Sequence, residues 1–299
     1  LDHDPSTGLR LCRTLWWFWE AHGHWSEAHR WIEAMLVAGP KASPYLRMQT
    51  LACFGALAWK RGDYAHVTTA LTECLALSRA HGAMSMVAHA LMLLGQIALE
   101  QGDYPQAASL LGESLTLKRG LGTPATEPLM HLGQLALAQE DYSQAQWLGE
   151  ECLEACQQVG DTFYPSLALR VLGESALALG EYERARRLLS ESVAFSQHSQ
   201  HRRVIAFALI AFASAISSGR QPSADDVRAA ARIWGTVEAQ REEVGLFLPV
   251  AESTRYERAI AHARAWVRPD EWAATWAEGR AMSLEQAIAF ALALPVVEM

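Results

Sequence analysis

Apolar and polar residues follow one another along most of this chain with the three-to-four-residue spacing of amphipathic helices. Such spacing places the apolar side chains on one helical face, which each helix must bury against a neighbour. Residues 94–115, LGQIALEQGDYPQAASLLGESL, show the layout most clearly. Gly102 and Asp103, a pair typical of a tight bend, separate two helical stretches. The segment therefore predicts a helical hairpin.

Four other segments repeat this layout at a nearly constant period. The aromatic residues that follow the bends are separated by 39, 40, 38 and 40 positions: Trp25, Tyr64, Tyr104, Tyr142 and Tyr182. Before each bend stands a second column of Trp16, Gly55, Gly95, Gly133 and Gly173, and after it a third of Ala28, Val67, Ala107, Ala145 and Ala185. The repetition predicts a tandem array in which small residues lie where two helices cross closely.

From Arg202 onward the pattern becomes irregular. An apolar stretch at 202–218 is followed by Gly219 and Pro222 and then by a long helical pattern at about 224–243, which predicts a stretched hairpin with an insertion in its bend. A further helix holding Tyr256 and Trp266 and two short helices, at about 270–278 and 284–294, are expected to cover the end of the array. The domain boundaries expected are an array over 1–245, with five regular hairpins over 8–199 and a sixth over 202–245, and a helical C-terminal cap over 246–299.

These patterns predict an all-α fold. We expect a right-handed superhelical solenoid of helical hairpins with a period of about 40 residues, closed by the helical cap. The first residues, LDHDPSTGLR, contain neither an initiator Met nor the apolar core of a signal peptide. We therefore expect a fragment of a longer protein.

Composition narrows the function classes. Hydrophobic residues make up 51% of the 299 positions and charged residues 19%, which favours a folded array over disorder. The formal net charge of -8 disfavours nucleic-acid binding by this portion, and no apolar run is long enough to cross a membrane. Five cysteines stand in apolar helical patterns, which suits a reducing cytoplasm: Cys12, Cys53, Cys74, Cys152 and Cys156.

Patterns with catalytic or metal-binding potential fail on their spacing. Residues 24–29, HWSEAH, do not place two histidines and the carboxylate on one helical face, as a zinc protease helix requires. Residues 173–175, GES, lack the closing glycine and the strand context of a nucleophile elbow. Cys152 and Cys156 are four positions apart, but no second ligand pair accompanies them. We expect no catalytic residue and no metal site.

Two surfaces are candidates for recognition. The N-terminal tryptophans Trp16, Trp17, Trp19, Trp25 and Trp31 are interpreted either as core packing or as a docking face for an upstream domain, and exposure of Trp19 would favour docking. In stacked hairpins the first helices line a concave groove, so their polar residues off the packing face form the second candidate. The groove residues expected from the repeat register are Arg10, Arg13, Trp17, Gln49, His89, Gln96, Glu127, Gln134, Arg170 and Glu174. We expect them to bind a protein or peptide partner or a small polar inducer, and ordinary solvated helix surface is the alternative.

The hairpin at 94–115 resembles the tetratricopeptide repeat, and this resemblance covers about residues 8–245. The period of 38 to 40 exceeds the usual value of about 34 and is similar to that of longer variants. A second resemblance rests on LRLCRTLWWFWEAHGHWSEAHRWIEAML at 9–36, RIWGTVEAQREEVG at 232–245 and WAEGRAMSLEQAIAFAL at 276–292. These segments are similar to the helical sensor region of bacterial STAND signal-transduction ATPases, in regulators of the LuxR-type and AfsR-like classes.

This second resemblance implies a non-catalytic region that senses a ligand or binds proteins within a larger cytoplasmic, ATP-dependent transcriptional or signalling regulator. An upstream nucleotide-binding domain in cis would be its partner. The chain itself contains no G-x-x-x-x-G-K-[ST] loop, so we expect no cofactor here and ATP only in the missing upstream domain. A free-standing scaffold that binds peptide segments of protein partners is the alternative. An enzyme is not expected, because no set of acid, base and nucleophile is visible.

Overall fold

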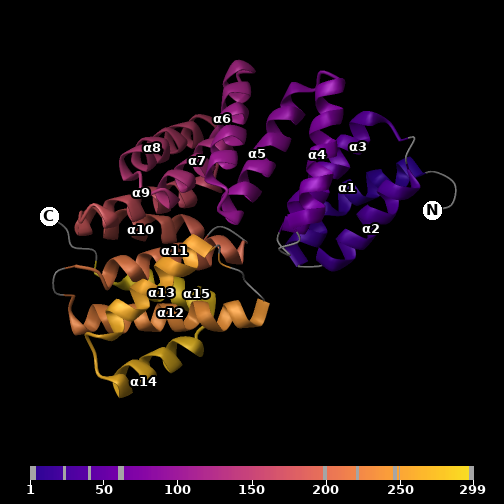
Figure 1. Ribbon diagram of the computed structural model, residues 1–299. Helices are drawn as coiled ribbons and strands as arrows, with labels where there is room; N and C mark the ends of the chain where they lie inside the picture. Colours follow the sequence, from indigo (N-terminus) through magenta and orange to yellow (C-terminus); the bar gives the residue numbers. More distant parts are fainter. Residues whose placement is uncertain are drawn as a thin grey trace. The chain divides into compact units, whose positions relative to one another are not determined.

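The structure is a computed structural model that describes residues 5–22, 25–39, 42–59, 64–197, 201–219, 222–244, 248 and 250–295. Within these residues every regular element is an α-helix, fifteen in all, and there is no strand (Figure 1). The expected all-α helical repeat is therefore confirmed. The chain divides into two compact units, Leu1–Pro128 and Leu129–Met299, which are described separately below. The domain boundaries expected from the sequence stay a prediction.

The first unit consists of successive hairpins. Its helices are α1 (Pro5–His22), α2 (Trp25–Ala38), α3 (Pro44–Trp59), α4 (Tyr64–Ala80), α5 (Met84–Gln101), α6 (Tyr104–Gly120) and the start of α7 (Thr126–Ala138). The aromatic column marks the first residue of every second helix here. The bend between α5 and α6 uses Gly102 at φ +79°, a left-handed conformation that favours glycine, and the Asp103 carboxylate accepts a hydrogen bond from the Gln106 N–H at 3.1 Å.

The glycine column lies where the two helices of a hairpin cross. A Cβ added at Gly95 would lie 2.7 Å from Leu111 Cγ, and one at Gly55 would lie 2.5 Å from Leu71 Cδ2. Both distances are shorter than a van der Waals contact, so a larger residue would displace a helix or a leucine. Val67 and Ala107 of the third column are fully buried. The packing role predicted for these columns is confirmed in this unit.

The second unit contains the last regular hairpins and the C-terminal helices. After the remainder of α7 come α8 (Tyr142–Val159), α9 (Tyr164–Ala178), α10 (Tyr182–Ser196), α11 (Arg202–Ile216), α12 (Ala224–Val244), α13 (Val250–Arg264), α14 (Pro269–Arg280) and α15 (Leu284–Ala293). Gly173 faces Leu189 as Gly95 faces Leu111, which extends the column into this unit. Helices α11 and α12 form the longer hairpin that the sequence predicts.

One expected boundary is wrong. Trp266 lies outside α13, in the turn that follows it, although the sequence placed it within the helix. The N–H groups of Ala265 and Trp266 donate to carbonyls three residues back, at His262 and Ala263, which tightens the end of the helix. Arg268 is then extended, as the residue before a proline prefers.

Three pairs of first helices from successive hairpins contact each other. In the first unit α1 contacts α3 and α3 contacts α5, and in the second α9 contacts α11. Among the residues described, the second helices show no comparable contact between α2 and α4, α4 and α6, or α8 and α10. In these pairs the first helices are therefore packed more closely than the second helices, and the groove itself stays a prediction.

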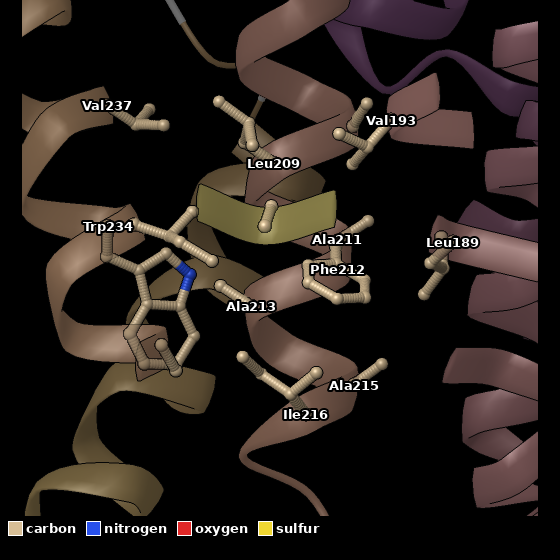
Figure 2. Packing of buried hydrophobic residues seen from close by; sticks show 14 of the residues in the cluster. Leu189, Val193, Leu209, Ala211, Phe212, Ala213, Ala215, Ile216, Trp234 and Val237 are labelled. Carbon is tan, nitrogen blue, oxygen red and sulfur yellow. The ribbon is translucent and has the colours of Figure 1, made fainter. Parts of the chain in front are cut away.

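The core of the second unit is built around α11. Leu189 and Val193 of α10 pack on one side of it and Trp234 and Val237 of α12 on the other (Figure 2). Phe212 lies between them and is almost completely buried. Because α11 is covered on both sides, its sequence is apolar nearly all round, which explains why its pattern departs from that of the earlier helices.

Helices α12 and α14 are neighbours (Figure 1), and their backbones approach closely at Gly235 and Gly279. A Cβ at Gly235 would collide with the carbonyl oxygen of Trp276, and one at Gly279 would collide with that of Arg232. The Thr236 hydroxyl donates a hydrogen bond to the Gly279 carbonyl at 2.7 Å. The two C-terminal segments that carry the second resemblance thus pack directly against each other.

Candidate functional site

The predicted groove residues of the first unit form two small groups. Arg13 Nη1 of α1 donates a hydrogen bond to Gln49 Oε1 of α3 at 3.1 Å, so these two residues meet. Arg10 is exposed, and the side chain of Trp17 is outside the described part of the structure. Of the predicted residues at this end of the unit, the structure thus brings together Arg13 and Gln49.

The second group lies on α5 and the start of α7. Lys118 Nζ of α6 and Glu127 Oε2 form an ion pair at 2.6 Å. Both charges act on the pKa of His89. Burial lowers the pKa of His89, and Lys118 lowers it further, while Glu127 acts in the opposite direction. Gln96 is half-buried on the same helix as His89. The predicted neighbours His89 and Glu127 are thus brought together.

The second unit contains a largely buried group of charges on α9 and α13. Arg170 Nη1 of α9 pairs with Glu174 Oε1 at 2.6 Å and with Glu252 Oε1 of α13 at 3.2 Å, and Arg255 of α13 pairs with Glu174 Oε2 at 3.4 Å. We call these four residues the α9/α13 charge cluster. The Arg170 side chain is only 3% exposed. Gln134, also predicted, lies on α7 and makes a 3.3 Å hydrogen bond with His131 Nδ1.

Electrostatics favour the charged forms of Arg170 and Glu174. Burial disfavours the charged form of Arg170, but Glu252 and Glu174 outweigh it and raise the pKa of Arg170. Burial alone would raise the pKa of Glu174, yet the charges of Arg170 and Arg255 lower it. Arg170 Nε and Nη2 are buried without a hydrogen-bond partner among the described residues, and the guanidinium carbon lies 5.4 Å from the ring centroid of Phe207. The cluster is therefore neutral in sum but incompletely hydrogen-bonded.

A cavity of about 410 Å³ adjoins this cluster between α9, α11 and α13. Leu177, Phe207, Ile210 and Ala259 supply apolar wall, and the remaining lining is polar or charged or consists of small residues. Helix α13 contacts α11 and α12, and the long Arg and Glu side chains join α13 to α9. The cavity lies where these side chains bridge the space between α13 and α9.

The sequence register found Arg170 and Glu174 but missed the residues of α13. Glu252, Arg255, Ala259 and His262 all line the cavity, and they recur at intervals of three or four positions, which places them on one face of a helix. That spacing could have identified the face. Because the sequence of residues 246–299 predicts only a cap, this face of α13 is not among the candidate surfaces predicted from it.

The tryptophan surface has a mixed outcome. Trp19 is only 3% exposed, so it belongs to the core, and its burial does not favour the docking interpretation. Trp31 is 36% exposed. Leu11, Leu15 and Phe18 are also exposed and share one face of α1, because they are spaced by four and three positions.

The remaining sequence expectations concern metal binding, the cysteine pair and membrane-spanning helices. No group of three or more His, Cys, Asp or Glu side chains among them could hold a metal ion. Cys152 and Cys156 are buried, and their mutual hydrogen bond together with burial raises the pKa of Cys152. Searched over the same part of the chain, none of the helices combines the length and the apolar character needed to cross a bilayer.

The tetratricopeptide repeat family model matches residues 126–198, a stretch that contains α7, α8, α9 and α10. No curated protein matches the chain. The match indicates that this region is a protein–protein interaction module of tetratricopeptide-repeat type. Such repeats are typically non-catalytic and usually bind no cofactor. The cavity beside Arg170 is thus lined partly by helix α9 of the matched stretch and partly by the helices that follow it.

Proposed function

We propose that this chain is a non-catalytic sensing and protein-interaction region of a larger cytoplasmic, ATP-dependent regulator of transcription or signalling. Its recognition surface is the face of the first helices in each unit. The observation that carries this proposal is the lining of the 410 Å³ cavity, where two residues selected by the repeat register, Arg170 and Glu174, lie side by side.

The contacts among first helices support this surface. A binding face needs polar groups that the packing of the repeat does not consume, and Gln96 and Gln134 are half-buried residues of this kind. The helices are already formed, so a partner that binds them pays little of the ordering cost that weakens association with flexible segments.

The regulator context rests on the second resemblance and on the crossing of α12 and α14, where two of the resembling segments contact each other. An upstream nucleotide-binding domain would be the partner in cis and would bind the ATP. Coupling between that domain and this one would require that each binds one of two states of the other more tightly. The coding sequence upstream of Leu1 tests this directly: a G-x-x-x-x-G-K-[ST] loop there supports the regulator, whereas a start codon close to Leu1 supports a free-standing scaffold.

A selection from a random short-peptide display library tests the recognition surface. Peptides that bind the wild-type chain should lose at least about tenfold in affinity, roughly 1.4 kcal/mol, in the double variant Gln96→Ala, Gln134→Ala. The matched control is Gln106→Ala, Gln144→Ala, which makes the same chemical change at exposed positions of second helices. Equal affinity for both double variants would contradict the proposed surface.

A further inference from the structure

The charges around the cavity between α9, α11 and α13 do not balance. Its lining contains three arginines, Arg170, Arg255 and Arg258, but only two glutamates, Glu174 and Glu252. Both glutamates are taken up by Arg170 and Arg255 in the α9/α13 charge cluster. The arginines and glutamates of the lining therefore leave one formal positive charge in excess.

Arg258 is the source of that excess. It lies on α13, one turn beyond Arg255, and no carboxylate in the described part of the chain pairs with it. Arg258 and Arg264, near the end of the same helix, are both exposed, but only Arg258 lines the cavity. An unpaired guanidinium beside a partly apolar cavity attracts an anion, because the low-dielectric wall weakens solvent screening.

The apolar wall sets the second requirement. Leu177 comes from α9, Phe207 and Ile210 from α11, and Ala259 from α13, so three helices contribute apolar surface to the same space. The cavity volume of about 410 Å³ falls within the range of about 300–1,000 Å³ that is usual for small-molecule sites. Such sites combine mainly apolar walls with a few polar groups that orient the ligand.

We propose that this cavity binds a small organic carboxylate with an apolar body, whose carboxylate pairs with Arg258 and whose body packs against Phe207, Ile210 and Leu177. A cation of the same shape is disfavoured by the excess positive charge, and a neutral molecule gains only the apolar contact. The ligand contacts the first-helix face and α13 together, so it stabilises their present arrangement. This proposal rests on the proposed sensing function, which the same cavity supports, and names the class of its ligand; its tests do not involve Gln96 or Gln134.

Isothermal titration calorimetry with sodium octanoate tests the site, with octylammonium and 1-octanol as probes of equal chain length but different charge. We expect saturable binding of octanoate at one site, weaker binding of 1-octanol and no binding of octylammonium. Arg258→Gln should weaken octanoate binding by at least about tenfold, which corresponds to roughly 1.4 kcal/mol, while Arg264→Gln leaves it unchanged.

A second pair of variants tests the location through volume instead of charge. Ala259→Leu fills the cavity and should abolish octanoate binding, while Ala261→Leu adds the same side chain at an exposed position of α13 outside the lining. The proposal is overturned if octanoate does not saturate, if octylammonium binds equally well, or if each variant behaves like its control. None of these outcomes alters the affinity of library peptides for the Gln96 and Gln134 variants, so the two proposals fail separately.

Discussion

The repeat hairpins and the C-terminal helices both bring two helices into close contact at glycines. The atoms that face these glycines differ between the two regions. In three of the hairpins, Gly55, Gly95 and Gly173 face leucine side chains, as Gly173 faces Leu189. At the crossing of α12 and α14, Gly235 and Gly279 face backbone carbonyl oxygens. A leucine can change its rotamer when a neighbour grows, whereas a carbonyl held in a helical hydrogen bond cannot move without its helix.

The difference explains why the hairpin crossings can be predicted from the sequence and the α12/α14 crossing cannot. Because the hairpin recurs, its crossing glycines stand at a constant period in the sequence. That period alone identifies the crossing. Gly235 and Gly279 occur once each, 44 positions apart, and nothing in the pattern indicates that they meet. The α12/α14 crossing could be recognised only from the structure.

The largest effect is expected where the two regions are joined, at the α9/α13 charge cluster. Arg170→Met leaves the partly buried Glu252 beside α9 without its ion-pair partner and should lower the free energy of unfolding by about 3–5 kcal/mol. Urea unfolding, with hydrogen exchange read in α9 and α13, measures it. Arg184→Met is the control, since its pairs with Glu181 and Glu150 are solvent-exposed and contribute at most about 1 kcal/mol. Equal losses of unfolding free energy in both variants would show that the α9/α13 charge cluster contributes no more than an exposed ion pair.

The next effect compares the two kinds of crossing directly. Gly279→Ala should cost about 3 kcal/mol, at the upper end of overpacking penalties, because the Arg232 carbonyl cannot move aside. Gly173→Ala should cost less, about 1–2 kcal/mol, and Leu189→Val in the same chain should restore part of the loss by shortening the obstructing side chain.

Gly112 provides the control for both substitutions. It lies inside α6 with nothing within 4 Å of an added Cβ, so Gly112→Ala should stabilise the helix by about 0.5–1 kcal/mol. The unfolding free energies of the set, with hydrogen exchange read in α6, α10 and α14, check the order. If Gly279→Ala and Gly173→Ala cost the same, and Leu189→Val restores nothing, the distinction between side-chain and backbone obstacles is wrong.

A smaller effect is expected from protonation of Glu174. Its folded-state pKa is lowered, because Arg170 and Arg255 outweigh the effect of burial, so the unfolded chain binds the proton more tightly. The stability that the carboxylate contributes is fully present above its unfolded pKa of about 4.3 and is lost as the pH falls through the lower folded value.

Urea titrations of the wild-type chain and of Glu174→Gln across the acidic range measure this effect. The difference in stability between the two chains should shrink as the pH falls below the unfolded pKa. A difference that stays constant with pH would show that the charge of Glu174 contributes nothing.

The candidate site, like the fold, has residues on repeat helices, which the sequence predicted, and residues on α13, which it did not. The repeat register selected Arg170 and Glu174 because the hairpins recur, and it also selected Arg13 with Gln49 and His89 with Glu127, which the structure places near each other. It could not select Glu252, Arg255 or Arg258, because α13 belongs to no repeat and only the folded chain carries it beside α9. Periodicity predicts what each repeat does but not how a unique helix packs on it.

The claim that recognition in the second unit combines the first-helix face with α13 is tested most directly by hydrogen exchange of the whole chain with and without octanoate. The account predicts that exchange slows in α9, α11 and α13 and is unchanged in α14. Slowing confined to other helices, or no change at octanoate concentrations that saturate the calorimetric signal, would contradict it.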